Sequence, residues 1–454
     1  MTIRTFAHVS AKFCAMLCAI APLAAIPGRA QEPAPANGAP RVTLEDALAR
    51  ARRYAGQIQS ANLAVLQAGQ DTFQARAARR PSVNAFNQFI YTEANGTPSG
   101  VFVANDGVHI YNEQAVVHQE LLSVVRRGEV DRAAAAEAIA RARVEIAARG
   151  LDITVIQDYY GILSAQRRFA NAQTSVTEAQ RFLEIAQQLQ QGGEVARADV
   201  VKAQHELEQR QRSLQEARYA IERAKIALGV LIFPAFSADF EVVDDLDQSP
   251  VLAPIAEAQA QAAASSPDLK AAAAGIQEAG HEITVARYGY LPSLGLDVFY
   301  GINANQFAAR THYPVAEGLP YRQNLGYSAQ VTLNIPVWNW GATRSKIKQA
   351  ELKRDQAQVE LTQAQRTLQG NLAAVHAEAR AAQGQFDPLR RAIDTASEIL
   401  RLTVLRYQAG EAIALEVSDA QSTVTQARNA YNDGLARYRV AETTLRSLTG
   451  ALQP

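Results

Sequence analysis

The side chains most able to do chemistry in this 454-residue sequence are seven histidines, at positions 8, 109, 118, 205, 281, 312 and 376. None of them shows the spacing of a metal-binding motif such as HxxxH. His205-Glu206 and His281-Glu282 lie on helical patterns, where we expect ordinary surface pairs. The sequence has no GxSxG elbow, phosphate-binding glycine loop or dinucleotide fingerprint. We therefore expect no catalytic residue, no metal site and no cofactor.

The N-terminal segment predicts export. A positive start, an apolar stretch and small residues before Ala30 are typical of a secretory signal peptide over 1–30, followed by a linker over 31–41. Cys14 and Cys18 both lie in this segment, and neither follows a small residue, which disfavours lipidation. The mature chain would then contain neither a disulfide nor a thiolate metal site.

The charge balance indicates no nucleic-acid partner. Cleavage removes three basic residues and no acidic ones, which leaves 42 basic against 45 acidic residues and a formal charge of −3. Beyond residue 26 no run of 18 or so uncharged apolar residues occurs, so no transmembrane helix is expected. An exported chain of this kind could enter a membrane only as β-strands.

The elements that position any functional residue occur twice. Pro81-Ser82 returns as Pro292-Ser293 after 211 positions, and Gly193-Glu194 returns as Gly410-Glu411 after 217. A period this long is no short solenoid repeat, and it predicts one large unit built twice. The expected domains are a first repeat over 42–238, a connector over 239–254 and a second repeat over 255–450.

Each copy contains a helical hairpin. Apolar and small residues recur at alternating steps of four and three over 417–448, and over 200–231 with Arg210 the one interruption. This seven-residue period is that of a coiled-coil seam. Glycine breaks the pattern before each seam, so we expect hairpin tips at 192–194 and 409–411. A plain coiled-coil scaffold would fit these helices equally well.

Each copy is also expected to contain a pair of strands. Apolar and polar residues alternate clearly in the second copy and less cleanly in the first, where the repeat of Pro81-Ser82 is the main indication. The strand length of about ten residues is what a tilted strand needs to cross a bilayer. Both tryptophans, Trp338 and Trp340, follow the last strand, as in an aromatic girdle at a membrane interface. The edge of a soluble β-sandwich is the alternative. The four strands are predicted near 83–92, 113–123, 293–303 and 324–337.

Four strands per chain require an oligomer. A closed bacterial barrel has about eight strands or more. An open sheet would expose unpaired backbone groups to lipid at several kcal/mol each. Three copies would supply roughly twelve strands. The predicted fold class is therefore mostly α with a membrane β-barrel, in which four barrel strands and long coiled-coil helices per chain close as a trimer.

With these elements the chain resembles the TolC-type outer membrane efflux proteins. The residues that carry the resemblance are the strand-to-helix segment 334–341, the strand entry 291–293 and the tip segment 406–411, within a duplicated order that covers roughly 42–450. The resemblance implies a homotrimer with a shared barrel in outer membrane lipid and a helical tunnel in the periplasm. It also implies that the tunnel meets a periplasmic adaptor protein coupled to an inner-membrane pump.

The resemblance further implies two sets of site residues. Acidic residues that narrow the periplasmic mouth of the family correspond to Glu416 and Asp419, which three copies would stack as two cation-favouring rings. Solvated helix charges are the alternative. The family commonly has aspartate at the first of these positions and a basic residue where Ala412 stands, which leaves a gating ion pair there unsupported. The tips Gly193, Glu194, Gly410 and Glu411 are candidates for adaptor docking, with simple turn chemistry as the alternative.

The function that follows is an outer membrane exit duct, with a periplasmic extension, that passes small toxic molecules or drugs. The alternative within the family is the exit channel of a type I protein secretion system. From another class, a periplasmic coiled-coil structural or adaptor protein would explain the heptads but not the amphipathic strands.

Overall fold

The structure is a computed structural model that describes residues 40–91, 109–248, 250–311 and 322–451. The predicted signal peptide and most of the predicted linker lie outside these ranges. From Arg41 onward the chain packs as one unit. Helices make up most of it, and none of those described is both long and apolar enough to cross a membrane.

The order of the elements reproduces the duplication. Helices α6 and α7 of the second copy begin and end 211 positions after α2 and α3 of the first copy. Helix α10 likewise begins and ends 217 positions after α5. The first copy consists of α2 (Leu44–Tyr54), α3 (Gly56–Ala77), β2 (Ser82–Tyr91), β3 (His109–Leu122), α4 (Val124–Gln191) and α5 (Arg197–Ile232). The second consists of α6 (Ile255–Ser265), α7 (Pro267–Tyr288), β5 (Ser293–Ala304), β8 (Leu325–Asn334), α8 (Ala342–Gly384), α9 (Phe386–Gln408) and α10 (Ala414–Thr449).

The two copies differ in their longest helix. In the first copy α4 runs without a break for 68 residues, which corresponds to about 100 Å. In the second copy the same stretch is divided into α8 and α9 at Gln385. Pro388 explains the break, because its nitrogen carries no hydrogen for a bond to the carbonyl four residues earlier.

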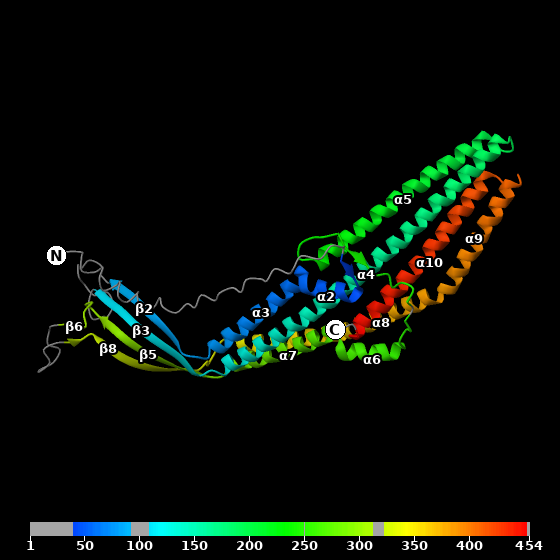
Figure 1. Ribbon diagram of the computed structural model, residues 1–454. Coiled ribbons are helices and arrows are strands. Elements are labelled where there is room, and N and C mark those ends of the chain that lie inside the picture. The colour runs from blue at the N-terminus through cyan, green and yellow to red at the C-terminus, as the bar shows by residue number, and fades with distance from the viewer. Residues whose placement is uncertain (1–39, 92–108, 249, 312–321, 452–454) are drawn as a thin grey trace, which may run out of the picture. The chain divides into compact units, whose positions relative to one another are not determined.

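The strands of both copies form one antiparallel sheet in the order β2-β3-β5-β8 (Figure 1). Cross-strand pairs such as Val83↔Val117 and Val117↔Val298 place apolar side chains on one face. The neighbouring pair His118↔Asp297 lies on the other face, where His118 Nδ1 is 2.6 Å from Asp297 Oδ1. The last strand ends at Asn334, earlier than 337, because Pro336 cannot donate a ladder hydrogen bond.

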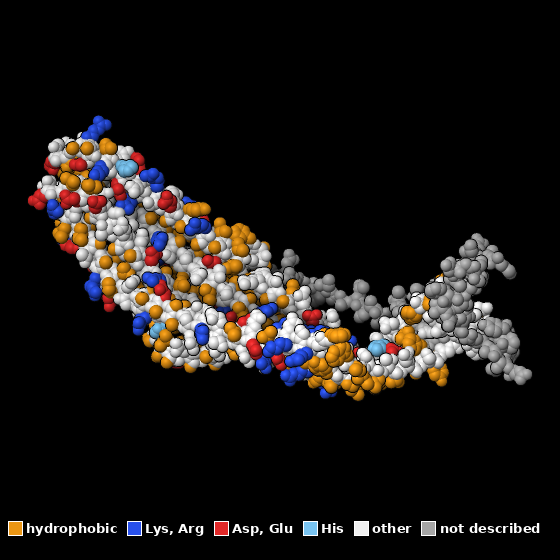
Figure 2. All heavy atoms as spheres, turned by 180° about the vertical axis from the view of Figure 1, so that it is seen from behind, with side chains coloured by type: hydrophobic (Ala, Val, Ile, Leu, Met, Phe, Trp, Pro, Cys, Tyr) orange, Lys and Arg blue, Asp and Glu red, His pale blue; other side chains and the backbone are white. Residues whose placement is uncertain are grey.

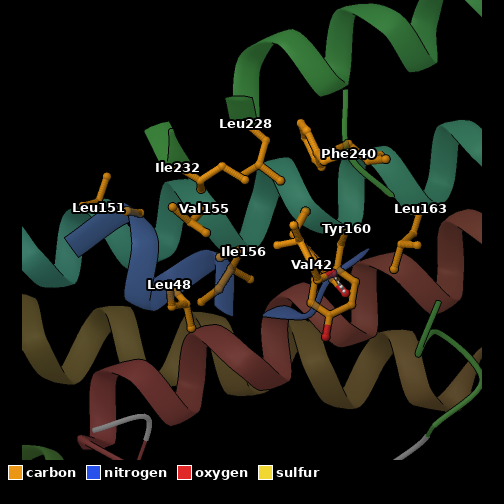
Figure 3. Close-up of a cluster of buried hydrophobic side chains, with 14 of the residues drawn as sticks. Val42, Leu48, Leu151, Val155, Ile156, Tyr160, Leu163, Leu228, Ile232 and Phe240 are labelled. Atoms are coloured by element: carbon orange, nitrogen blue, oxygen red, sulfur yellow. Dashed lines mark hydrogen bonds between the residues drawn. The ribbon is translucent and has the colours of Figure 1, made fainter. Parts of the chain in front are cut away.

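The main hydrophobic core lies where α2, α4 and α5 meet the connector (Figure 3). Two short parallel strands, β1 (Arg41–Val42) and β4 (Glu241–Val242), tie the start of the unit to the connector. The Tyr159 hydroxyl donates to Val243 O at 2.7 Å, which fastens this strand pair to α4. The core therefore fastens the connector to the middle of α4.

The two hairpins, α4/α5 and α9/α10, are joined by a row of polar contacts between the antiparallel α4 and α10. Along α4 these contacts follow one another at one or two helical turns, so the two helices are held in a fixed register. The contacts are Ser164–Asp433 at 3.0 Å, Asn171–Asn429 at 2.8 Å, Ser175–Thr425 at 2.7 Å and Glu178–Arg428 at 3.1 Å.

Candidate functional site

Both hairpin tips are built on the same glycine turn. Gly193 and Gly410 have φ of +79° and +75°, a left-handed conformation that favours glycine. The residue after each glycine donates its backbone N–H across the end of the helix, Glu194 to Leu189 O at 2.9 Å and Glu411 to Arg406 O at 2.8 Å. Each tip thus satisfies the last carbonyls of its first helix and leaves Glu194 and Glu411 exposed.

The two tips lie side by side because they share one hydrophobic cluster (Figure 1). Phe182 of α4 and Tyr407 of α9 meet edge to face with ring centroids 5.1 Å apart. Burial, with a smaller contribution from the negative charge of Asp199, raises the pKa of Tyr407 above its usual range. All four candidate docking residues therefore lie at one end of the paired hairpins.

The structure brings Glu416 and Asp419 together on the exposed face of the first turns of α10. Glu416 already has partners within the hairpin. Its Oε2 lies 3.4 Å from Arg406 Nη1, and its Oε1 accepts from the Ile413 N–H at 3.5 Å. Arg406 also donates to Glu411 O at 3.1 Å. Glu416 thus helps to cap α10 and to hold α9 against it.

Asp419 is the freer of the two carboxylates. Among the described residues no cation pairs with its side chain, and the Thr423 hydroxyl donates to its backbone carbonyl at 2.8 Å. An exposed carboxylate of this kind can attract cations. Over the placed part of the chain, no three His, Asp or Glu side chains form a group that could hold a metal ion.

Sequence reasoning missed the role of Arg406. It stands ten positions before Glu416, on the other side of the glycine turn, and faces it only because the hairpin folds back. A basic residue in the last turn of one helix and an acidic residue in the first turn of the next were the signal that could have identified the pair. The cation beside Glu416 therefore comes from position 406 and not from position 412, which is Ala412.

The two tryptophans lie between β8 and α8, beyond the end of the strand. Trp338 and Trp340 are 75% and 89% exposed, with ring centroids 5.7 Å apart. Trp340 has φ of +54° and Gly341 has φ of +83°, so two consecutive left-handed residues turn the chain from the strand into α8. This turn holds both rings on the outside of the junction.

Comparison with known proteins gives a consistent result. Residues 259–451 match the outer membrane efflux protein family. The chain is 26% identical over 287 residues to the pyoverdine export outer membrane protein OpmQ of Pseudomonas putida, and 28% identical over 172 residues to the outer membrane protein TolC of Vibrio cholerae. These matches cover 61% and 37% of this chain, and they span 56% and 37% of the relatives' own lengths, less than two thirds of either.

The fold is shared over a longer stretch than the sequence. The crystal structure of the Campylobacter jejuni outer membrane channel CmeC superposes with a TM-score of 0.74 at 17% identity, covering 90% of this chain and 85% of that one. At this identity the likeness shows the fold alone.

Proposed function

We propose that this chain, whose residues 259–451 match the outer membrane efflux protein family, is the outer membrane exit duct of a tripartite export system. In this proposal a homotrimer forms a shared β-barrel in the outer membrane and a helical tunnel below it. The tips of the tunnel dock a periplasmic adaptor, which connects the duct to an inner-membrane pump.

The observation that carries the proposal is the four-stranded sheet with one apolar face and two open edges. Strands β2 and β8 form its outer edges, and neither pairs on its outer side with any other described strand. Exposed apolar side chains such as Val83, Tyr327 and Val331 cover one face, at 71%, 83% and 62% exposure. In lipid such edges must be closed, and neighbouring copies of the same sheet would close them.

The helices support the same assembly. Large apolar side chains remain uncovered along helices that pack on only one side within the chain. A soluble monomer rarely leaves so many large apolar groups exposed. They are Leu63, Leu66 and Phe73 on α3, Val201, Tyr219, Ile226 and Val230 on α5, and Leu352 and Val359 on α8.

The test of the proposal is the mass of the protein extracted from outer membranes, with bound detergent subtracted. We expect a trimer that needs detergent to stay in solution. A monomer released without detergent would refute the duct and would favour a periplasmic helical scaffold. The cargo follows from the pump, so a small-molecule duct and a type I secretion channel are separated by identifying the inner-membrane partner that co-purifies.

Within this proposal Asp419 and Glu416 form acidic rings at the periplasmic mouth. Asp419 contributes most of the charge, because Arg406 offsets part of that of Glu416. In planar bilayers the Glu416→Gln/Asp419→Asn variant should lose cation preference, and Asp419→Asn alone should lose most of it. Glu257→Gln/Asp394→Asn, which removes two exposed charges outside the tips, is the matched control. Unchanged selectivity in the first variant would rule out the rings.

The hairpin tips are the proposed docking site for the adaptor. Glu194 and Glu411 are exposed, and the sequence has no cysteine beyond residue 18, so Glu194→Cys and Glu411→Cys each introduce a unique thiol. We expect a bifunctional thiol-to-amine crosslinker to yield an adduct with the adaptor in cells. Glu257→Cys on α6 serves as the control position. If the tip variants crosslink no more than the control, the tips are not the docking site.

A further inference from the structure

A pocket of about 370 Å³ lies where β3 ends and α4 begins. Three arginines and one glutamate contribute the charged side chains of its lining, so its charge is positive although the chain as a whole is neutral. The lining consists of Arg79, Gln119, Glu120, Leu121, Leu122, Ser123, Val124, Arg126 and Arg127.

Two of these arginines are available to an anion. Arg126 is already occupied, since its Nε lies 3.0 Å from Glu120 Oε2 and its Nη1 lies 3.1 Å from Glu129 Oε2. Arg79 and Arg127 are exposed, and no acidic group of the described residues pairs with either. The positive charge that remains after the internal pairs are counted is therefore that of Arg79 and Arg127.

The pocket adjoins the apolar face of the sheet. Leu121 and Leu122 in its wall are 52% and 53% exposed. Gln119 lies on the same face of β3 as Val117, because side chains alternate along a strand, and its Nε2 donates to Arg79 O at 3.2 Å. This hydrogen bond holds the Arg79 segment against the apolar side of the strand. A ligand here would meet guanidinium groups at one end and leucine side chains at the other.

Basic residues also mark the corresponding junction of the second copy. Arg344 and Lys346, at the start of α8, are exposed and have no acidic partner in the parts that are described. They follow the exposed Trp338 and Trp340 directly. Figure 2 shows Lys and Arg side chains gathered beside a hydrophobic area at the transition from the helices to the sheet. Positive charge therefore borders the apolar surface at both strand-to-helix junctions.

We propose that the pocket formed by Arg79, Arg127, Leu121 and Leu122 binds an anionic glycerophospholipid of the membrane leaflet that the junction adjoins. This rests on the proposed function, since it requires the sheet to lie in a membrane. Guanidinium groups match the oxygens of a phosphodiester in a bidentate manner, and basic side chains next to a membrane attract anionic lipids. A zwitterionic headgroup would bring an ammonium group among the arginines and bind more weakly.

The experiment is native mass spectrometry of the full chain in detergent, titrated separately with phosphatidylglycerol and phosphatidylethanolamine. Wild type should bind phosphatidylglycerol more tightly than phosphatidylethanolamine. The Arg79→Gln/Arg127→Gln variant should bind phosphatidylglycerol more weakly than wild type does, by a factor of about ten or more. Arg181→Gln/Arg212→Gln, which removes two exposed arginines of the hairpin helices, should bind like wild type. Arg79→Lys/Arg127→Lys keeps the positive charges but loses the bidentate guanidinium geometry, so its affinity for phosphatidylglycerol should lie between those of wild type and the glutamine variant.

Three results would overturn the lipid site. They are equal binding of the two lipids by wild type, unchanged phosphatidylglycerol binding by the glutamine variant, and displacement of the lipid by inorganic phosphate at millimolar concentration. The last result would assign the pocket to small anions. The same spectra report the oligomer mass, so a failed duct shows as a monomer, whereas a failed lipid site shows as a trimer without lipid preference.

Discussion

At the scale of single residues, Asp245 has a buried charged partner near the main core. Its Oδ2 lies 2.5 Å from Arg439 Nη2 and accepts from the Tyr160 hydroxyl at 3.2 Å, and Arg439 is only 7% exposed. Without the Asp245 carboxylate, Arg439 keeps one acidic partner, Glu442 at 3.5 Å, so the cost of the loss is about 1–3 kcal/mol. We therefore expect Asp245→Asn to lower the free energy of unfolding by that amount, measured by denaturation in detergent.

The control for this prediction lies two positions away. Asp247 pairs with Arg167 at 2.8 Å, but its side chain is 71% exposed. Such a pair contributes about 0–1 kcal/mol, so Asp247→Asn should leave stability nearly unchanged. Equal losses in the two variants would mean that burial does not distinguish the two pairs.

The neighbouring tyrosines predict a dependence on alkaline pH. Burial raises the pKa of Tyr160 to about 12, against an ordinary value of 10.0, and raises that of Tyr159 as well. The folded state therefore holds these protons more tightly than the unfolded state. Their contribution to stability is complete below pH 10 and is lost as the pH rises through the folded-state pKa values.

The measurement is the free energy of unfolding at several pH values between 10 and 12. Wild type should lose stability more steeply over this range than Tyr159→Phe/Tyr160→Phe, which has no phenol to ionise at these positions. Tyr219→Phe, which changes a tyrosine that is 63% exposed, should keep the slope of wild type. If the free energy of unfolding fell with pH at the same slope in all three proteins, the pH dependence would not come from Tyr159 and Tyr160.

At the scale of elements, the glycine turns at the hairpin tips should be sensitive to a single methyl group. An added Cβ at Gly193 or Gly410 meets no atom within 4 Å, so the cost is the left-handed backbone alone. Each Gly→Ala change should destabilise its tip by about 1 kcal/mol. Hydrogen exchange of the tip amides would detect this. Gly370→Ala, within α8 and also free of contacts, should instead stabilise its helix by about 0.5–1 kcal/mol.

The contact between the hairpins depends on Tyr407, which is 1% exposed and whose hydroxyl has no partner in the described chain. Tyr407→Phe removes only that unpaired hydroxyl and should be neutral or slightly stabilising. Tyr407→Ala removes the ring that packs on Phe182 and should cost about 3–5 kcal/mol. Protease sensitivity of the hairpins would show both effects. A Phe variant as sensitive as the Ala variant would mean that the hydroxyl, and not the ring, joins the hairpins.

At the scale of the whole molecule, the exposed apolar side chains of α5 should govern assembly. Ile226 and Val230 are 47% and 62% exposed in the single chain. Ile226→Glu/Val230→Glu should therefore leave the fold intact by circular dichroism but abolish the proposed trimer, in which these charges would be buried between copies. Gln209→Glu/Gln211→Glu adds the same charge to exposed polar positions of α5 as a control. A variant that still forms trimers would exclude this face from the interface.

The elements that depend on local chemistry could be predicted from the amino-acid sequence. Alternation over 293–303 indicated a strand where β5 lies, and the two glycine turns fall where the helical pattern stops. Repetition across 211 and 217 positions indicated two copies, and the bounds of α2, α3 and α5 recur at those distances. These features could be predicted because periodicity, glycine and proline act over a few residues.

How deeply each copy of the heptad pattern is buried depends on the tertiary structure. The seam of α10 is deeply buried at Val417, Val424 and Tyr438, whereas the matching stretch of α5 remains partly exposed, because α10 packs on α4, α8 and α9 and α5 packs mainly on α4. The Arg406–Glu416 pair and the basic pocket beside β3 likewise join segments that are distant in the chain or turned by a loop. The heptad pattern determines which face of a helix is apolar. Whether that face is covered in α10 or left partly exposed in α5 depends on how the other helices pack.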